Sequence, residues 1–152
     1  MPASKKPRKK YRPPQTEVRP GHIKLFRFGR DSEMWLLHQP HQALESLRTG
    51  SATAKDYDAL SLRILWAAQM VKDHIIESEP LDIVTPALMA LESIGQRYDR
   101  TGKLGMSGEE FRLLGGGLEL ADQLQGTLTR KEMEQSFKTV MGKRNQQIRA
   151  QA

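Results

Sequence analysis

The feature that most constrains the fold of this 152-residue chain is the spacing of apolar residues between Thr53 and Glu77. These residues recur at alternating intervals of three and four, which is the period of one face of an α-helix. Thr53 is placed to cap the helix, and Asp56, three residues later, completes a capping box. The pattern predicts a helix that ends near Glu77 and is roughly 36 Å long. Its apolar stripe comprises Tyr57, Leu60, Ile64, Leu65, Ala67, Ala68, Val71, His74 and Ile75.

The next segment predicts a second long helix after a break at Pro80. Proline costs little in the first turn of a helix, so we expect Pro86 near the start, with Thr85 as a cap. The inward stripe of this helix is expected to comprise Leu81, Val84, Leu88, Leu91, Gly95 and Tyr98.

Helix signals continue on both sides of these two segments. A glycine-containing loop over 99–108 leads to a helix capped by Ser107, and Thr129 with Glu132 forms the capping box of the last helix. Before Thr53, Pro40 interrupts or restarts a short helix that ends at Gly50. The inward residues of these helices are expected to be Ala43, Leu44, Leu47, Phe111, Leu114, Leu118, Ala121, Met133, Phe137 and Val140 or Met141.

Together these signals predict an all-α fold, a small bundle of about four main helices with an extended basic N-terminal arm. Residues 1–30 form the arm, which is rich in proline and expected to be disordered, with a short apolar segment at 23–28. Period alone leaves that segment open between a strand and an apolar strap across the helices. The bundle is assigned to residues 31–141 and a basic C-terminal tail to residues 142–152.

The charge is divided unevenly along the chain. Residues 1–30 carry ten basic side chains and one acid, a net charge of +9. Residues 31–138 carry 11 basic and 17 acidic side chains, a net charge of −6, and the last fourteen residues add +3. The formal net charge of +6 therefore describes an acidic body between two basic ends.

The basic arm predicts contact with nucleic acid or another polyanion, because neutralising phosphates releases condensed counterions. A tyrosine among basic residues can also stack on an unpaired base. No base-reading motif accompanies the arm, so little sequence specificity is expected. A solubilising tail is the alternative. The predicted nucleic-acid-binding residues are Lys5, Lys6, Arg8, Lys9, Lys10, Tyr11, Arg12, Lys143 and Arg144.

Other chemistry finds little support in the sequence. The chain has no cysteine, which excludes disulfides and thiolate sites and favours a reducing cytoplasm. No apolar run is long enough for a membrane span, and no secretory signal is expected. His38 and His41 are three residues apart, but Pro40 between them spoils a shared metal geometry, and the glycines 115–117 lack the flanks of a phosphate loop. We therefore expect no metal, no cofactor and no enzymatic activity.

Two tryptophans raise a second functional hypothesis. Trp35 and Trp66 are candidate partner-binding residues, since tryptophan is enriched at protein interfaces. At helical spacing such residues more often belong to a packed core. A protein-interaction module that binds another protein through the bundle is thus the alternative function, and a homodimer of bundles also stays open.

Several short patterns resemble a family of small, largely uncharacterised bacteriophage and prophage proteins. The resemblance lies in the basic head that ends Lys10-Tyr11-Arg12-Pro13, in the residues from Ala43 to Leu60, and in Leu118-Glu119-Leu120 and Met133-Glu134. It implies a phage gene product that acts in the bacterial cytoplasm, and it supplies no activity or site residue. The leading expectation is a non-enzymatic phage accessory protein that binds nucleic acid through its basic arm.

Overall fold

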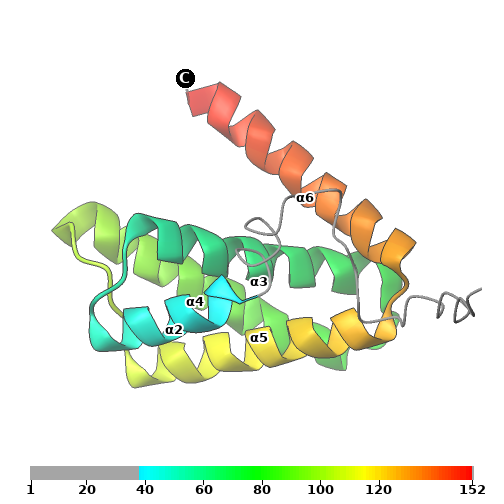
Figure 1. Cartoon of the computed structure of the whole chain (residues 1–152), viewed down its shortest axis with the longest axis horizontal. Coiled ribbons are helices and arrows are strands. Elements are labelled where there is room, and N and C mark those ends of the chain that lie inside the picture. The colour runs from blue at the N-terminus through cyan, green and yellow to red at the C-terminus, as the bar shows by residue number, and fades with distance from the viewer. Residues whose placement is uncertain (1–37, 152) are drawn as a thin grey trace, which may run out of the picture.

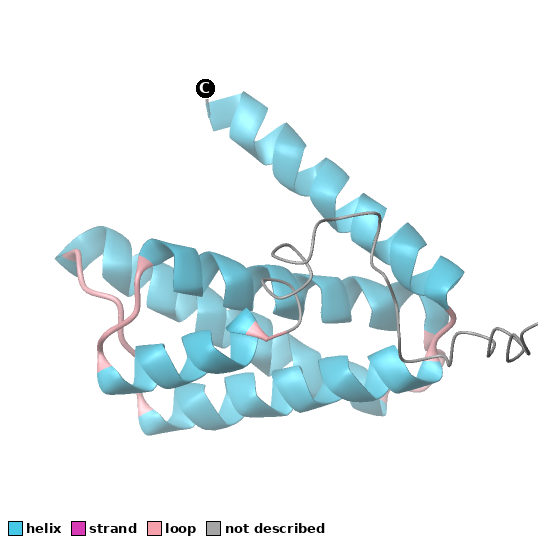
Figure 2. Cartoon of the chain, in the orientation of Figure 1, coloured by secondary structure: helices cyan, strands magenta, loops and turns pink. Residues whose placement is uncertain are grey.

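The computed structural model describes residues 38–151, and the predicted all-α fold is confirmed there. Five helices account for the regular structure of this range, and loops join them (Figures 1 and 2). The basic arm, the segment 23–28 and Trp35 lie outside the described residues. The helices are α2 (Gln39–Thr49), α3 (Ala54–His74), α4 (Glu79–Thr101), α5 (Gly108–Thr127) and α6 (Arg130–Gln151).

The predicted helix boundaries are confirmed wherever a side-chain cap defines them. Thr53 and Asp56 form the capping box of α3, and Ser107 and Glu110 form that of α5. At α6, the Thr129 N–H donates to Glu132 at 2.8 Å. A cap satisfies backbone N–H groups that the first helical turn leaves unpaired, so its sequence pattern fixes a boundary locally.

The C-terminal end of α2 is also determined by interactions within its own last turn. Gly50 adopts a left-handed conformation with φ of 77°, and its N–H donates to the Leu47 and Ser46 carbonyls. Pro40 lies in the first turn of α2, where a missing N–H costs nothing.

Three boundaries differ from the prediction. Helix α3 ends at His74, three residues before Glu77. Helix α4 begins at Glu79, so Pro80 lies in its first turn and Pro86 lies inside the helix. Pro86 has no N–H, so the carbonyl of Asp82, four residues earlier, loses its helical hydrogen bond. Asp82 is exposed, and its carbonyl can bond water instead. Helix α6 continues to Gln151, through residues that were assigned to the basic C-terminal tail.

Helix α3 is the centre of the bundle and contacts each of the other four helices. Its buried face is wider than predicted, since it includes Leu62, Arg63, Trp66 and Met70 besides the expected residues. Leu65, in contrast, is 43% exposed, so its assignment to the core stripe is wrong. Helices α2 to α5 run roughly along the long axis in Figure 1, whereas α6 leaves α3 obliquely and its C-terminal end stands clear of the bundle.

The close packing of α3, α4 and α5 depends on a glycine. A Cβ at Gly117 would lie 2.8 Å from Ile64 Cδ1 and 2.9 Å from Ala87 Cβ. Close helix–helix approach, rather than phosphate binding, is thus the role of this glycine within the run 115–117. The core residues that α4 contributes are Val84, Ala87, Ala90, Leu91 and Ile94, while Leu81 and Tyr98 of the predicted stripe are exposed.

An ion pair joins the ends of α4 and α5. Arg97 donates to Glu110 through both guanidinium nitrogens, at 2.6 and 3.2 Å, and also to the Gly105 carbonyl. Burial opposes ionisation of Glu110, but the hydrogen bonds from Arg97 and the Ser107 N–H outweigh it and lower the pKa of Glu110. The pair therefore fixes the loop 102–107 between the two helices.

None of the helices in residues 38–151 combines the length and the apolar character that crossing a membrane requires.

Candidate functional site

The seam between α3 and α6 begins as an apolar contact near the start of α6. Trp66 is fully buried there, and its indole Nε1 donates to the Met133 carbonyl at 3.1 Å. The Phe137 ring meets the Trp66 ring edge to face, with centroids 5.2 Å apart. Val140 is the last buried residue of α6. Up to this residue, apolar packing holds α6 against α3.

A chain of polar contacts runs along the same seam. The Ser136 hydroxyl donates to Asp73 at 2.8 Å, and Gln69 donates to the other oxygen of Asp73 at the same distance. Lys143 then donates to the Gln69 carbonyl oxygen at 3.0 Å, and Arg144 pairs with Asp58. Because these residues satisfy one another, they fix the orientation of α6 on α3.

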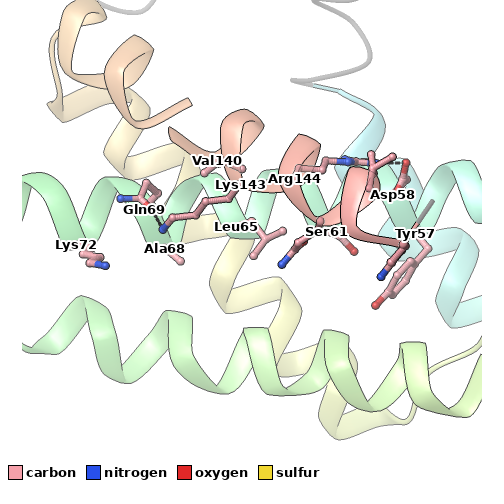
Figure 3. Close-up of a pocket in the computed structure, with 13 residues that line it drawn as sticks. Tyr57, Asp58, Ser61, Leu65, Ala68, Gln69, Lys72, Val140, Lys143 and Arg144 are labelled. Atoms are coloured by element: carbon pink, nitrogen blue, oxygen red, sulfur yellow. Dashed lines mark hydrogen bonds and ion pairs between the residues drawn. The ribbon is translucent and has the colours of Figure 1, made fainter. Parts of the chain in front are cut away.

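Beyond Val140 the two helices separate and enclose a wedge-shaped groove of about 550 Å³ (Figure 3). The long side chains of Lys143 and Arg144 bridge the gap, reaching Gln69 and Asp58 on α3. Its apolar lining includes Leu65 and Ala68 of α3 and Val140 and Ile148 of α6. Leu65 and Ile148 are 43% and 56% exposed, so the groove is an open apolar surface.

Lys143 and Arg144 are therefore the only predicted nucleic-acid-binding residues that fall within residues 38–151, and both are engaged with α3. Their positive charges serve an intramolecular contact in this structure. The other predicted residues, Lys5, Lys6, Arg8, Lys9, Lys10, Tyr11 and Arg12, lie outside the described range, and their binding role stays a prediction.

Trp66 is a packed core residue and not a partner-binding residue. Its side chain has no exposed area, so it offers no surface to a partner protein, and an anchor role for it is wrong. Burial, the indole hydrogen bond and the Phe137 contact all assign it to packing. Trp35, its companion in that hypothesis, lies outside the described residues.

A second pocket opens at the N-terminal end of α3, between Ala54 and Tyr98, and shares Tyr57 and Asp58 with the groove. Tyr57 forms its wall and donates its hydroxyl to the Leu91 carbonyl of α4 at 2.7 Å. Burial raises the pKa of Tyr57, and the negative charges of Asp99 and Asp58 add to the effect. The hydroxyl fits because position 95 is glycine: a Cβ there would lie 2.8 Å from it. The phenol is thus a neutral structural donor.

A buried arginine was not foreseen from the sequence. Arg63 is 2% exposed, donates to Asp122 at 3.0 Å and to Gln125 at 2.7 Å, and stacks 5.3 Å above the centre of the Trp66 ring. Burial lowers the pKa of Arg63, although its pairing with Asp122 opposes that change. On the surface side, His41 lies 3.1 Å from Asp122. This cluster joins α2, α3 and α5.

The histidines do not gather into a metal site within residues 38–151, where no group of three potential ligands occurs. His41 contacts Asp122, and the His74 ring nitrogen Nε2 lies 3.2 Å from the Glu132 carbonyl oxygen. His74, which belongs to the predicted apolar stripe, is therefore a half-buried residue whose ring is hydrogen-bonded to α6.

The chain matches no protein-family model, no curated protein and no solved structure.

Proposed function

We propose that this protein is a non-enzymatic accessory protein of a bacteriophage or prophage, which acts in the bacterial cytoplasm and binds nucleic acid through its basic N-terminal arm with little sequence preference. The observation that carries the proposal is the division of charge. Residues 1–30 have a net charge of +9, whereas residues 38–129 carry eight basic and 13 acidic side chains, a net charge of −5.

This division gives the two parts opposite effects on a polyanion. The acidic helices repel phosphates, so a complex has to be held by the basic segments. Six cations between Lys5 and Arg12 that contact phosphates would contribute about −5 to the slope of log K against log salt on duplex DNA. Phosphate contacts carry no sequence information, which is why little specificity is expected.

The test uses the full-length chain and fluorescence anisotropy with a labelled duplex of roughly 20 base pairs, between about 0.05 and 0.3 M salt. An arm-neutral variant replaces the six cations with glutamine: Lys5, Lys6, Arg8, Lys9, Lys10 and Arg12. It should lose about five units of slope and nearly all binding near 0.15 M salt.

A matched control removes six exposed cations outside the arm instead, five in helices α2 to α5 and one in the loop after α4, namely Arg48, Lys55, Lys72, Arg100, Lys103 and Arg112. The control changes the net charge equally, so it isolates direct contacts from the overall field of the protein. Equal binding by the arm-neutral variant and the unaltered chain would refute the proposal.

A second candidate function is a protein-interaction module that binds a host or phage protein through the bundle, and the groove between α3 and α6 favours it. Leu65 and Ile148 expose apolar surface there. If this function holds, a partner retained after nuclease treatment should be lost from Leu65→Lys. It should be kept by Met89→Lys, a matched change at an exposed α4 residue that does not line the groove.

A further inference from the structure

The solvent-facing side of α6 carries three aligned cations. Lys131 and Lys138 are seven residues apart, and Lys138 and Arg149 are eleven apart. Along a helix, seven or eleven residues rotate the chain to within about 20° of a whole number of turns. The three residues therefore share one face of α6. All three are exposed, and within residues 38–151 none of them makes an ion pair. We call these three residues the outer face of α6.

The outer face differs from the inner side of the same helix. Ser136, Phe137 and Val140 are buried against α3, and Arg144 pairs with Asp58. Both acids of α6 are already engaged, because Glu132 accepts the Thr129 N–H and Glu134 pairs with Arg130. The positive charge of the outer face is therefore not neutralised within its own helix.

The charge of α6 also contrasts with that of the helices behind it. Helix α6 carries six basic and two acidic side chains, a net charge of +4, while residues 38–129 have a net charge of −5. Because the C-terminal end of α6 stands clear of the bundle (Figure 1), a large anion can approach this end of the outer face without first meeting the acidic helices. Residues 145–151 are all exposed.

The chemistry of the outer face favours the phosphate backbone of a duplex over other anions. The cations are spaced by roughly 10 and 16 Å along a rigid helix, a span over which duplex DNA presents phosphates at many positions. Single-strand binding uses aromatic side chains on which bases stack. The only aromatic residue of α6, Phe137, is buried. A helix that lies on a membrane needs large apolar residues beside its cations. The neighbours between the cations, Gln135, Gly142, Asn145 and Gln146, are polar or small.

We propose that the outer face of α6 is a second, structured contact surface for double-stranded nucleic acid, which binds the phosphate backbone in addition to the basic arm. The inference rests on the proposed function, because the arm supplies most of the charge. It replaces Lys143 and Arg144, the C-terminal residues predicted from the sequence, with Lys131, Lys138 and Arg149. The complex then has one contact through the arm and a second through α6.

The experiment compares two triple variants of the full-length chain on the same labelled duplex. The outer-face variant is K131Q/K138Q/R149Q. The matched control, K55Q/R100Q/K103Q, removes three exposed cations of α3, α4 and the loop that follows α4. Glutamine preserves helix propensity, so both variants should fold, which far-UV circular dichroism checks. The outer-face variant should bind the duplex roughly 10- to 100-fold more weakly near 0.1 M salt and lose two to three units of slope, roughly 0.9 per phosphate contact.

A variant with an added positive charge tests the proposed contact surface independently. Gln135 lies between Lys131 and Lys138 and is exposed, so Gln135→Lys should strengthen duplex binding several-fold and steepen the slope by about one unit. A single-stranded thymidine oligomer should respond less to the outer-face variant than the duplex does.

Three results would overturn the inference: a slope of the outer-face variant equal to that of the control, an equal loss on single-stranded and duplex DNA, or a loss confined to vesicles of anionic phospholipid. The arm-neutral variant separates the two proposals. If it still binds as the unaltered chain does, the proposed function fails, whereas an outer-face variant that behaves like its control refutes only the α6 surface.

Discussion

Replacing Gly117 with alanine tests the packing of the three long helices that carry the fold. The added Cβ would lie 2.8 Å from Ile64 Cδ1 and 2.9 Å from Ala87 Cβ, closer than carbon atoms pack. The Ile64 methyl can rotate away, but the Ala87 Cβ is fixed to the α4 backbone, so α4 and α5 have to separate. Overpacking of this kind costs about 2 kcal/mol, and alanine returns about 1 kcal/mol of helix propensity. Gly117→Ala should therefore lower the free energy of unfolding by about 1 kcal/mol.

Gly115 provides a matched control two residues away in the same helix. A Cβ at that position meets no atom within 4 Å, so Gly115→Ala should raise the free energy of unfolding by about 1 kcal/mol. Urea denaturation followed by circular dichroism measures both variants, with the slope of unfolding free energy against urea expected to stay constant. The predicted difference between the two variants is about 2 kcal/mol. Equal stability of the two alanine variants would refute the close-approach argument.

Two further predictions concern the α4–α5 pair and the α3–α6 seam. The folded-state pKa of Glu110 lies below 4.5, so the stabilisation by its carboxylate is present above that pH and is lost as the pH falls through the folded-state pKa. Glu110→Gln should therefore show a smaller loss of stability between about pH 7 and pH 3 than the unaltered chain, measured by urea midpoints, and an unchanged loss would contradict this. Trp66→Phe removes the donor to the Met133 carbonyl and leaves a space beside Phe137. It should therefore destabilise the fold by about 2 kcal/mol in the same assay. A urea midpoint within error of that of the unaltered chain would contradict the packing role.

Helix caps were predictable because their determinants are local. The capping boxes at Thr53, Ser107 and Thr129 each place a hydroxyl and a carboxylate three residues apart, and the glycine at 50 takes the left-handed conformation that other residues avoid. The physical reason is that a cap satisfies the backbone of its own turn and needs no knowledge of the rest of the chain.

The orientation of the helices was less predictable, since it depends on neighbours that are remote in sequence. Leu65 and Trp66 are adjacent, and either position extends the apolar stripe of α3 plausibly. Helix α6 packs over the side of α3 that bears Trp66, which buries the tryptophan completely and leaves Leu65 on the groove. Arg63 shows the same limit: an arginine at this position becomes a core residue only because Asp122 and Gln125 of α5 lie within hydrogen-bonding distance.

The predicted start of α4 was wrong because of its two prolines. Pro80 was interpreted as a break and Pro86 as the start of a helix, but the helix begins at Glu79 and contains both. The cost of an internal proline is a lost hydrogen bond to one carbonyl, and here that carbonyl belongs to the exposed Asp82. Solvent exposure of the affected turn, which the sequence alone does not state, decides whether a proline ends a helix.

The two sides of α6 show why residue type alone did not identify a candidate surface. Lys143 and Arg144 were selected because they are basic and adjacent, yet adjacency puts residues about 100° apart on a helix, and these two turn toward α3. Lys131, Lys138 and Arg149 are scattered in the sequence, and the helical period brings them onto one exposed face. A search for basic residues at intervals of seven and eleven would have found them, but only after 142–151 had been recognised as part of the helix. The positions at which a helix continues therefore decide which of its charges face solvent and which hold the fold together.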